Sequence, residues 1–279
     1  LSGLLIQSFI AAVNVIDWVK GRSVTCADKI ITSIGISRIF YHTAHLLSLY
    51  STVWFPGIPT IAFALIEFTE NSSAFADVWL SSLLSIFFYV KISTSHNVFF
   101  LRLKAIILER VTYLIIAFVF LCLGCSAMNY FSQTLKVSRN SAHGYNLDDR
   151  ELQIIMYINS LWIIFPLLVF FIASFLLIIS LGFHMRRMNN GGNVTSSTDT
   201  YHRIMKFTAV SFLTCVIYFI INIFQIYNSL LNFLWFSVLV NIFPVPHSVF
   251  LIYITTKLRN WFLRIVRCGT HCFFNRKAQ

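Results

Sequence analysis

Seven runs of apolar residues divide the chain, and short polar connections separate them. Each run is close to the roughly 20 residues that an α-helix needs to cross a bilayer. The third and fifth runs are longer, which indicates tilted helices or helices that extend beyond the bilayer. The seven runs are Leu1–Trp18, Ile30–Tyr50, Ser73–Phe100, Val111–Met128, Leu152–Phe183, Ile204–Tyr227 and Asn232–Ile254. The pattern predicts an all-α membrane protein, folded as a bundle of seven transmembrane helices.

Composition supports a membrane environment. Of the 279 residues, 57% are hydrophobic and only 11% are charged, whereas soluble domains carry about 25% charged residues. Lipid can solvate apolar helix surfaces that water cannot. The net charge of +11 is spread between the apolar runs, not along one face, so nucleic acid is not expected as a partner.

The basic residues also predict the orientation of the spans. Seventeen of the 21 Lys and Arg residues fall in connections on one side of the predicted membrane, and only Lys136, Arg139 and Arg150 fall on the other. Cytoplasmic loops are enriched in Lys and Arg. We therefore expect a multi-pass plasma-membrane protein with an extracellular N-terminus and a cytoplasmic C-terminus.

We expect two parts: a transmembrane domain over residues 1–256 and a cytoplasmic tail over residues 257–279. In the tail, Trp261 and Phe262 alternate with arginines, which is typical of a basic amphipathic helix on an anionic lipid surface. Cys268 and Cys272 follow this segment. They are either palmitoylation sites or unmodified thiols.

Arg38 is the most unusual residue within a predicted span. It lies about eight positions into the second run, roughly 12 Å along a helix, where an arginine costs about 2.5–3.5 kcal/mol. It is therefore expected to face the bundle interior, as helix-packing glue or as part of a switch. Asp77 is expected to lie too near the outer end of the third span to reach it. The predicted partners are instead neutral: Ser33, Gln7, Ser85 or backbone carbonyls.

No catalytic or metal-binding arrangement is apparent. His42 and His45 are three residues apart, but no third metal ligand accompanies them, so they are interpreted as packing or pocket-lining residues. No cofactor, metal or enzymatic activity is predicted. Asn71 begins an Asn-Ser-Ser sequon on the predicted outer side and is a candidate glycosylation site.

Several stretches match motifs in the same order and spacing. Phe9–Lys20 fits FIxxVNxxDW, and Ala27–Thr32 with Ile36–Arg38 fits ADxIxT followed by AISR. In the middle of the chain, Trp79–Ile92 fits WLATSLSxFYxLKI and Phe100–Lys104 fits FLxLK. Later in the chain, Leu177–Met188 fits LxxSLxxHxxxM and Ile217–Phe219 fits IYF. Pro244–Arg259 fits the seventh-helix motif PxxH(P/S)xxLIxxNxKLK. Together they resemble the bitter taste receptor family (taste receptor type 2).

Three departures from the family pattern matter. Ser93–His96 in place of ANFS, together with Thr255 in place of an Asn of the seventh helix, indicates a divergent member. The second outer loop, Asn129–Glu151, lacks the sequon that is common there in the family. Glu70, Ala74 and Val78 stand where many members have Trp and Asn. Ligand preferences of the family are therefore not transferred to this chain.

The resemblance implies a GPCR-like chemoreceptor that binds bitter small molecules and activates a gustducin-like heterotrimeric G protein. Two alternatives stay open: a type 1 vomeronasal (pheromone) receptor, which has a similar seventh-helix signature, and a membrane transporter. The ending Asp17-Trp18 and the spacing Ser180, His184 and Met188 favour the taste receptors. A transporter usually has repeats or broken helices, and neither is apparent.

Candidate site residues follow from this implied function. Ligand contacts are expected in the outer half of the bundle, and Tyr218, Asn222 and Gln225 share one helical face. Tyr218 is also the candidate hinge between ligand and G protein. The full ligand set is Ala74, Val78, Asn159, Trp162, Tyr218, Asn222, Gln225 and Ser237. The coupling and switch set is Arg38, Lys91, Arg102, Lys104, His184, Lys206 and Tyr218.

Overall fold

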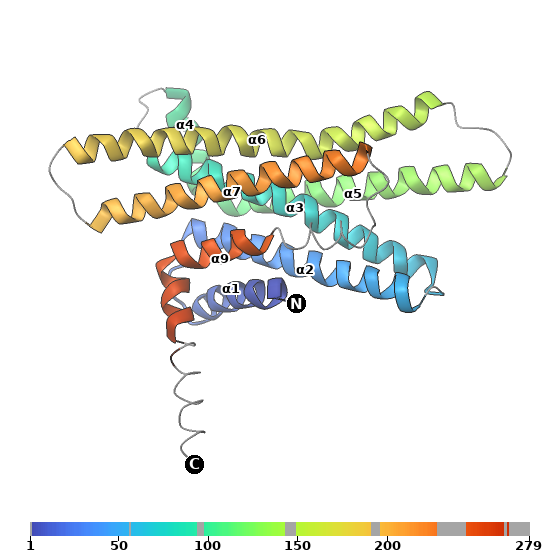
Figure 1. Ribbon diagram of the computed structural model, residues 1–279, viewed down its shortest axis with the longest axis horizontal. Helices are drawn as coiled ribbons and strands as arrows, with labels where there is room; N and C mark the ends of the chain where they lie inside the picture. The colour runs from blue at the N-terminus through green and yellow to red at the C-terminus, as the bar shows by residue number, and fades with distance from the viewer. Residues whose placement is uncertain are drawn as a thin grey trace, which may run out of the picture. The chain divides into compact units, whose positions relative to one another are not determined.

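The computed structural model describes residues 2–55, 57–93, 98–142, 149–190, 196–227, 244–264 and 267. All regular structure in these ranges is helical (Figure 1). The helices with complete bounds are α1 (Ser2–Val19), α2 (Cys26–Trp54), α3 (Thr60–Ile92), α4 (Val98–Glu109), α5 (Val111–Ala142), α6 (Asp149–Asn190), α7 (Ser196–Tyr227) and α9 (Pro244–Ile254). Residues 256–264 form a further helical segment, here named the tail helix.

Three stretches of the described chain are long and apolar enough to cross a membrane: Thr60–Ile92, Val111–Met128 and Ile164–Arg186. They belong to α3, α5 and α6. The first, second and sixth predicted runs are also helical, in α1, α2 and α7. Residues 232–243 of the seventh run lie outside the described residues, and its remainder forms α9. An all-helical membrane architecture is therefore confirmed for the described part of the chain.

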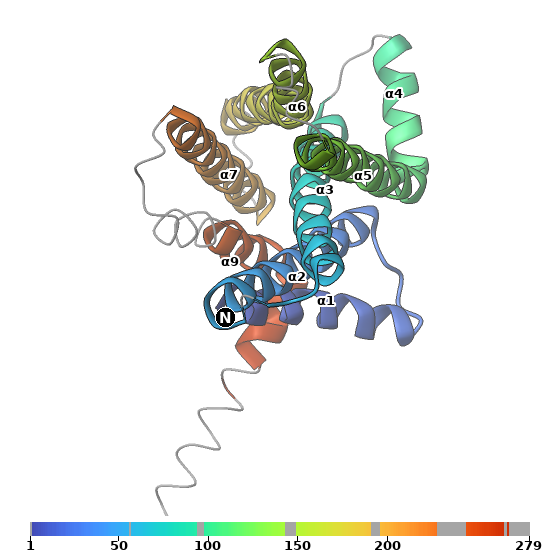
Figure 2. The same cartoon turned by 90° about the vertical axis from the view of Figure 1, so that its right-hand side faces the viewer.

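The helices form two compact units. One contains Leu1–Val24 and Ile178–Gln279, and there α9 packs on both α1 and α7. The other contains Thr25–Leu177, and there α3 packs on α2 and on α5. Figure 2 shows the second unit with α3 between these two neighbours.

Helices α2 and α3 pack on each other, and both carry buried apolar side chains. Ile30 and Ile34 of α2 and Leu80, Leu84 and Val90 of α3 are all almost completely buried. Large apolar residues on other faces stay exposed, for example Phe40 and Leu65. In water such exposure would be unfavourable, but it suits lipid.

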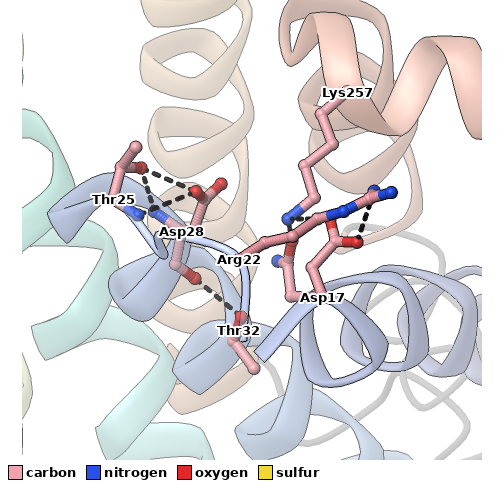
Figure 3. Close-up of polar contacts among 7 residues, drawn as sticks. Asp17, Arg22, Thr25, Asp28, Thr32 and Lys257 are labelled. Atoms are coloured by element: carbon pink, nitrogen blue, oxygen red, sulfur yellow. Dashed lines mark hydrogen bonds and ion pairs between the residues drawn. The ribbon is translucent and has the colours of Figure 1, made fainter. Parts of the chain in front are cut away.

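Local sequence signals determine the helix ends on either side of residues 20–25. Gly21, at φ 68°, ends α1, because its left-handed conformation lets Gly21 N–H reach the Trp18 carbonyl and Arg22 N–H reach the Asp17 carbonyl, each at 3.0 Å. This is the Schellman arrangement. Thr25 and Asp28 then begin α2 with a capping box, in which each side chain accepts from the other's backbone N–H (Figure 3).

The predicted bounds of the third span were wrong. The helix begins at Thr60, not Ser73, and α3 ends at Ile92, not at Phe100. Pro59 is the N-cap residue, and a proline is compatible with a helix start because it has no N–H to leave unpaired. Glu67, Glu70 and Asn71 lower the local hydropathy, which hides this first part of the helix in the sequence.

Candidate functional site

Arg38 is buried between helices, as predicted, but its partner is Asp77. The Arg38 Nε donates to Asp77 Oδ1 at 2.8 Å, and the two side chains are 5% and 23% exposed. The expectation that Asp77 is too shallow was therefore wrong. Because α3 starts at Thr60, Asp77 is its eighteenth residue, about 26 Å from the helix start.

The three side chains predicted as neutral partners of Arg38 make hydrogen bonds with other residues. The Ser33 hydroxyl donates to the Lys29 carbonyl of the same helix, α2. The Gln7 side chain of α1 donates to the Ser248 hydroxyl of α9. Ser85 accepts from Ser174 of α6 at 3.3 Å. A charged partner is physically preferable, because a buried guanidinium needs an opposite charge as well as acceptors.

A second polar pair joins α2 to α3 two helical turns away. His45 Nδ1 lies 2.6 Å from Glu70 Oε1, with exposed fractions of 13% and 21%. The Tyr41 ring stacks on His45 at 5.9 Å between ring centroids. The two interactions, Arg38–Asp77 and His45–Glu70, are named here the α2–α3 pairs.

Sequence spacing contained an unused signal for these pairs. Arg38 and His45 are seven residues apart, and so are Glu70 and Asp77. Residues seven apart share a helical face. Two such sets on antiparallel neighbouring helices can therefore pair at both positions, as they do in the structure.

Ala74 and Val78, the two predicted ligand contacts on α3, lie next to these pairs in sequence and are half-buried. Next to Ala74, the Ser73 carbonyl of α3 accepts a hydrogen bond from the Ser37 hydroxyl of α2 at 2.7 Å. On the far side of Val78, Ser82 donates to both the Val78 carbonyl and the Pro166 carbonyl of α6. The Ala74–Val78 segment is thus held by hydrogen bonds to α2 and α6.

The other predicted ligand contacts are described only in part. Asn159 and Trp162 lie in α6, and Tyr218, Asn222 and Gln225 lie in α7, but their side chains are outside the described structure. Residues 218, 222 and 225 fall on one continuous helix, α7, as predicted. Ser237 lies outside the described residues. These ligand contacts stay predictions.

The predicted coupling and switch residues are distributed over five helices, with Arg38 on α2 and Tyr218 on α7 as described above. Lys91 is exposed in the last turn of α3, Arg102 is exposed on α4, and Lys206 is exposed on α7. His184 is half-buried in α6. Lys104 donates from Nζ to the Ser93 carbonyl at 3.3 Å, which satisfies the carbonyl end of α3. Lys104 therefore positions α4 against α3.

Asn71 lies inside α3 with an exposed side chain, and the hydroxyl of Ser72 is bonded to the Phe68 carbonyl. Asn71 was placed on the outer side, just before the predicted third span, and is instead part of the continuous helix α3. Glycosylation at Asn71 stays a prediction.

Sequence reasoning missed a cluster at the Val19 end of α1, which Figure 3 shows together with the α2 capping box. Lys257 Nζ donates to Asp17 Oδ2 and to Asn14 Oδ1, each at 2.9 Å. Arg22 Nη1 donates to the other carboxylate oxygen of Asp17 at 3.1 Å. Asn14, Asp17, Arg22 and Lys257 are named here the Asp17 cluster. Asn14, Asp17 and Lys257 lie in the matched motifs and Arg22 lies outside them, but nothing in the spacing paired residue 17 with residue 257.

The exposed apolar surfaces and the long apolar helices together indicate an integral membrane protein. The family model described as taste receptor protein (TAS2R) matches residues 1–270. Taste receptor type 2 member 125 of Rattus norvegicus is 30% identical over 92% of this chain and 87% of its own length. Member 31 of Pongo pygmaeus is 30% identical over 94% and 88% respectively.

The chain therefore belongs to the TAS2R taste receptor family. This confirms the resemblance found in the sequence and the function that it implied, a chemoreceptor of bitter taste. The vomeronasal and transporter alternatives are set aside by the same match, which covers nearly the whole chain.

Proposed function

We propose that bitter small molecules bind among side chains on three or more helices in the outer half of a seven-helix bundle and thereby activate a gustducin-like heterotrimeric G protein. The N-terminus is extracellular and the C-terminus cytoplasmic in this proposal. The observation that carries it is the family match over residues 1–270, because that range includes every helix of the described structure.

The α2–α3 pairs support a division of labour in this mechanism. The buried Arg38–Asp77 ion pair resists separation, because the guanidinium would lose the carboxylate that compensates its charge in a low dielectric. We therefore assign α2 and α3 the role of a rigid wall that carries Ala74 and Val78. A ligand that binds one state of the bundle better shifts the population toward it, and the moving parts are expected elsewhere.

Tyr218 of α7 is our candidate for the moving part. It lies in the same helix as Asn222 and Gln225 and, in the opposite direction along that helix, as Lys206. A rotation or tilt of α7 would link the ligand contacts to the basic coupling residue at its other end. This assignment rests on the continuity of α7 from Ser196 to Tyr227.

The function is tested by expression in cells that carry a chimeric gustducin α-subunit, with intracellular calcium as the signal. A panel should include the cations quinine and denatonium, neutral bitter glycosides, and odorants as negative compounds. We expect a dose-dependent response to at least one bitter compound and none to odorants. Verified surface expression with no response across a broad bitter panel would contradict the proposal.

The hinge is tested separately by Tyr218→Ala. We expect the response per surface receptor to fall roughly tenfold, which corresponds to a coupling free energy of about 1.4 kcal/mol. Tyr113→Ala is the matched control, because Tyr113 is 73% exposed on α5. Equal responses from the two variants would remove Tyr218 from the mechanism.

A further inference from the structure

The tail helix is attached to α1 at two points. Lys257 reaches Asn14 and Asp17, and five residues later the ring of Phe262 packs edge-on against Phe9 at 6.1 Å. The contacts run in opposite directions along the two helices, so the tail helix is antiparallel to α1. Leu258, beside Lys257, is completely buried.

The two cations that bind Asp17 differ in how exposed their side chains are. The Asp17 side chain is only 7% exposed, and it accepts from Lys257 on one oxygen and from Arg22 on the other. Lys257 is 26% exposed and Arg22 is 64% exposed. Arg22 belongs to the turn that follows α1, so it stays beside Asp17 whatever the tail helix does.

This arrangement lowers the cost of releasing the tail helix. A buried carboxylate that loses its only partner is strongly destabilising. Asp17 keeps Arg22 when Lys257 leaves, and the Lys257 ammonium can return to water. The attachment is therefore stable but reversible, unlike an isolated buried ion pair.

We propose that Asp17 is a positioning residue for G-protein coupling: by binding Lys257 it holds the tail helix against α1, and the attached state is the one that the G protein engages. The proposal rests on the proposed function. It explains why a chain with only 10 acidic residues places one of them, buried, at the junction between α1 and the tail.

The attachment also orients the exposed basic residues of the tail helix. Arg264 is exposed and lies over the Trp261 ring at 6.0 Å. With Lys257 bound to α1 and Leu258 buried, the rotation of this short helix about its axis is fixed. The partner chemistry that fits is an acidic surface of the G-protein α-subunit.

The first test measures attachment without any agonist. A spin label is placed at Asn260, an exposed position of the tail helix, through an unnatural amino acid in receptor reconstituted in lipid nanodiscs. We expect restricted motion in the wild type and in Lys257→Arg, which keeps a cation, and increased motion in Asp17→Asn and Lys257→Met. Lys20→Met is the matched control, since Lys20 is an exposed cation just after α1. Equal label motion in all variants would overturn the proposal.

The second test measures coupling. Purified receptor is mixed with a gustducin-type heterotrimer, and nucleotide exchange is followed as the heterotrimer concentration rises. We expect Asp17→Asn and Lys257→Met to raise the half-saturating heterotrimer concentration about fivefold, with rescue in Lys257→Arg and an unchanged value in Lys20→Met. If a variant increases the motion of the spin label but does not raise the half-saturating heterotrimer concentration, the proposal is also overturned.

The two tests separate failure of the attachment from failure of the receptor function. If the wild type drives no exchange at any heterotrimer concentration, the proposed function fails and the coupling role falls with it. If the wild type drives exchange and the variants match it, only the role of Asp17 is wrong. Response is expressed per folded receptor, so a misfolded variant does not imitate the predicted loss.

Discussion

The α2–α3 pairs and the Asp17 cluster both join helices through carboxylates, but they differ in how many cations each carboxylate can use. Asp77 is bonded to Arg38, which is itself 5% exposed and lies in the middle of a long helix. Asp17 is shared by Lys257 and Arg22, and Arg22 is mostly exposed. The Arg38–Asp77 and Lys257–Asp17 pairs are similarly exposed, and Asp17 differs in having a second, mostly exposed cation, Arg22.

This difference predicts different physical roles. Separation of Arg38 from Asp77 would take the carboxylate charge away from an almost fully buried guanidinium, so α2 and α3 should move as one body. Separation of Lys257 from Asp17 leaves neither charge isolated, so the tail helix can detach and return. Ion pairs of similar length, 2.8 and 2.9 Å, therefore support a rigid wall in one region and a reversible attachment in another.

The largest effect is expected from breaking the Arg38–Asp77 pair. Asp77→Asn removes the carboxylate charge that is bonded to the buried Arg38 guanidinium, and we expect the free energy of unfolding to fall by about 3–5 kcal/mol. Unfolding temperature in detergent and folded yield measure this loss. The double variant Asp77→Asn with Arg38→Met should recover most of it, because no charge is then buried. A double variant as unstable as the single one would contradict the account of α2–α3.

A smaller loss of stability is expected from Asp17→Asn. The side chain loses bonds to two cations, but both Lys257 and Arg22 remain hydrated, so we expect about 2 kcal/mol. Thermal unfolding measures this in the same preparation. A loss as large as that of Asp77→Asn would show that the attachment is not reversible.

Glu70→Gln tests the second α2–α3 pair. The variant keeps an acceptor for His45 and removes the carboxylate charge, so we expect about 1 kcal/mol of lost stability, the difference between a hydrogen bond to a charged acceptor and one to a neutral acceptor. Comparison with Glu67→Gln, a half-buried acid one turn away on α3, controls for a general effect of charge on that helix. If the two variants lose the same stability, the His45–Glu70 contact does not contribute to holding α2 against α3.

The smallest effect is expected from Lys104→Met. Lys104 satisfies the carbonyl end of α3 from the neighbouring helix α4, and such a cation is worth about 0.3–1 kcal/mol. Arg102→Met is the matched control, because Arg102 is exposed two residues away. Hydrogen exchange at the end of α3 should increase in the Lys104 variant alone. Unchanged exchange there would contradict a positioning role.

Sequence reasoning succeeded where a pattern acts within one helix. The apolar runs predicted six described helices, and the cost of an arginine in a span correctly placed Arg38 in the interior. Sequence reasoning failed where the depth of a residue in the membrane had to be compared between two separate helices. An error of 13 residues in the start of α3, caused by polar residues in its first turns, made Asp77 look too shallow for Arg38.

The Asp17 cluster was beyond sequence reasoning for a different reason. Asp17 and Arg22 are close in sequence, but the contact with Lys257 depends on how α1 meets the tail helix. No periodicity within either segment encodes that contact. The predicted ligand contacts could not be grouped into one site from the sequence for the same reason, because residues on separate helices share a site only when the helices pack together.

The claim on which the receptor mechanism depends is that the chain crosses the membrane an odd number of times with its basic connections inside the cell. Epitope tags added before Leu1 and after Gln279 test it in intact and permeabilised cells. We predict antibody binding to the N-terminal tag in intact cells and to the C-terminal tag only after permeabilisation. Detection of both tags in intact cells, or of neither until permeabilisation, would contradict the mechanism.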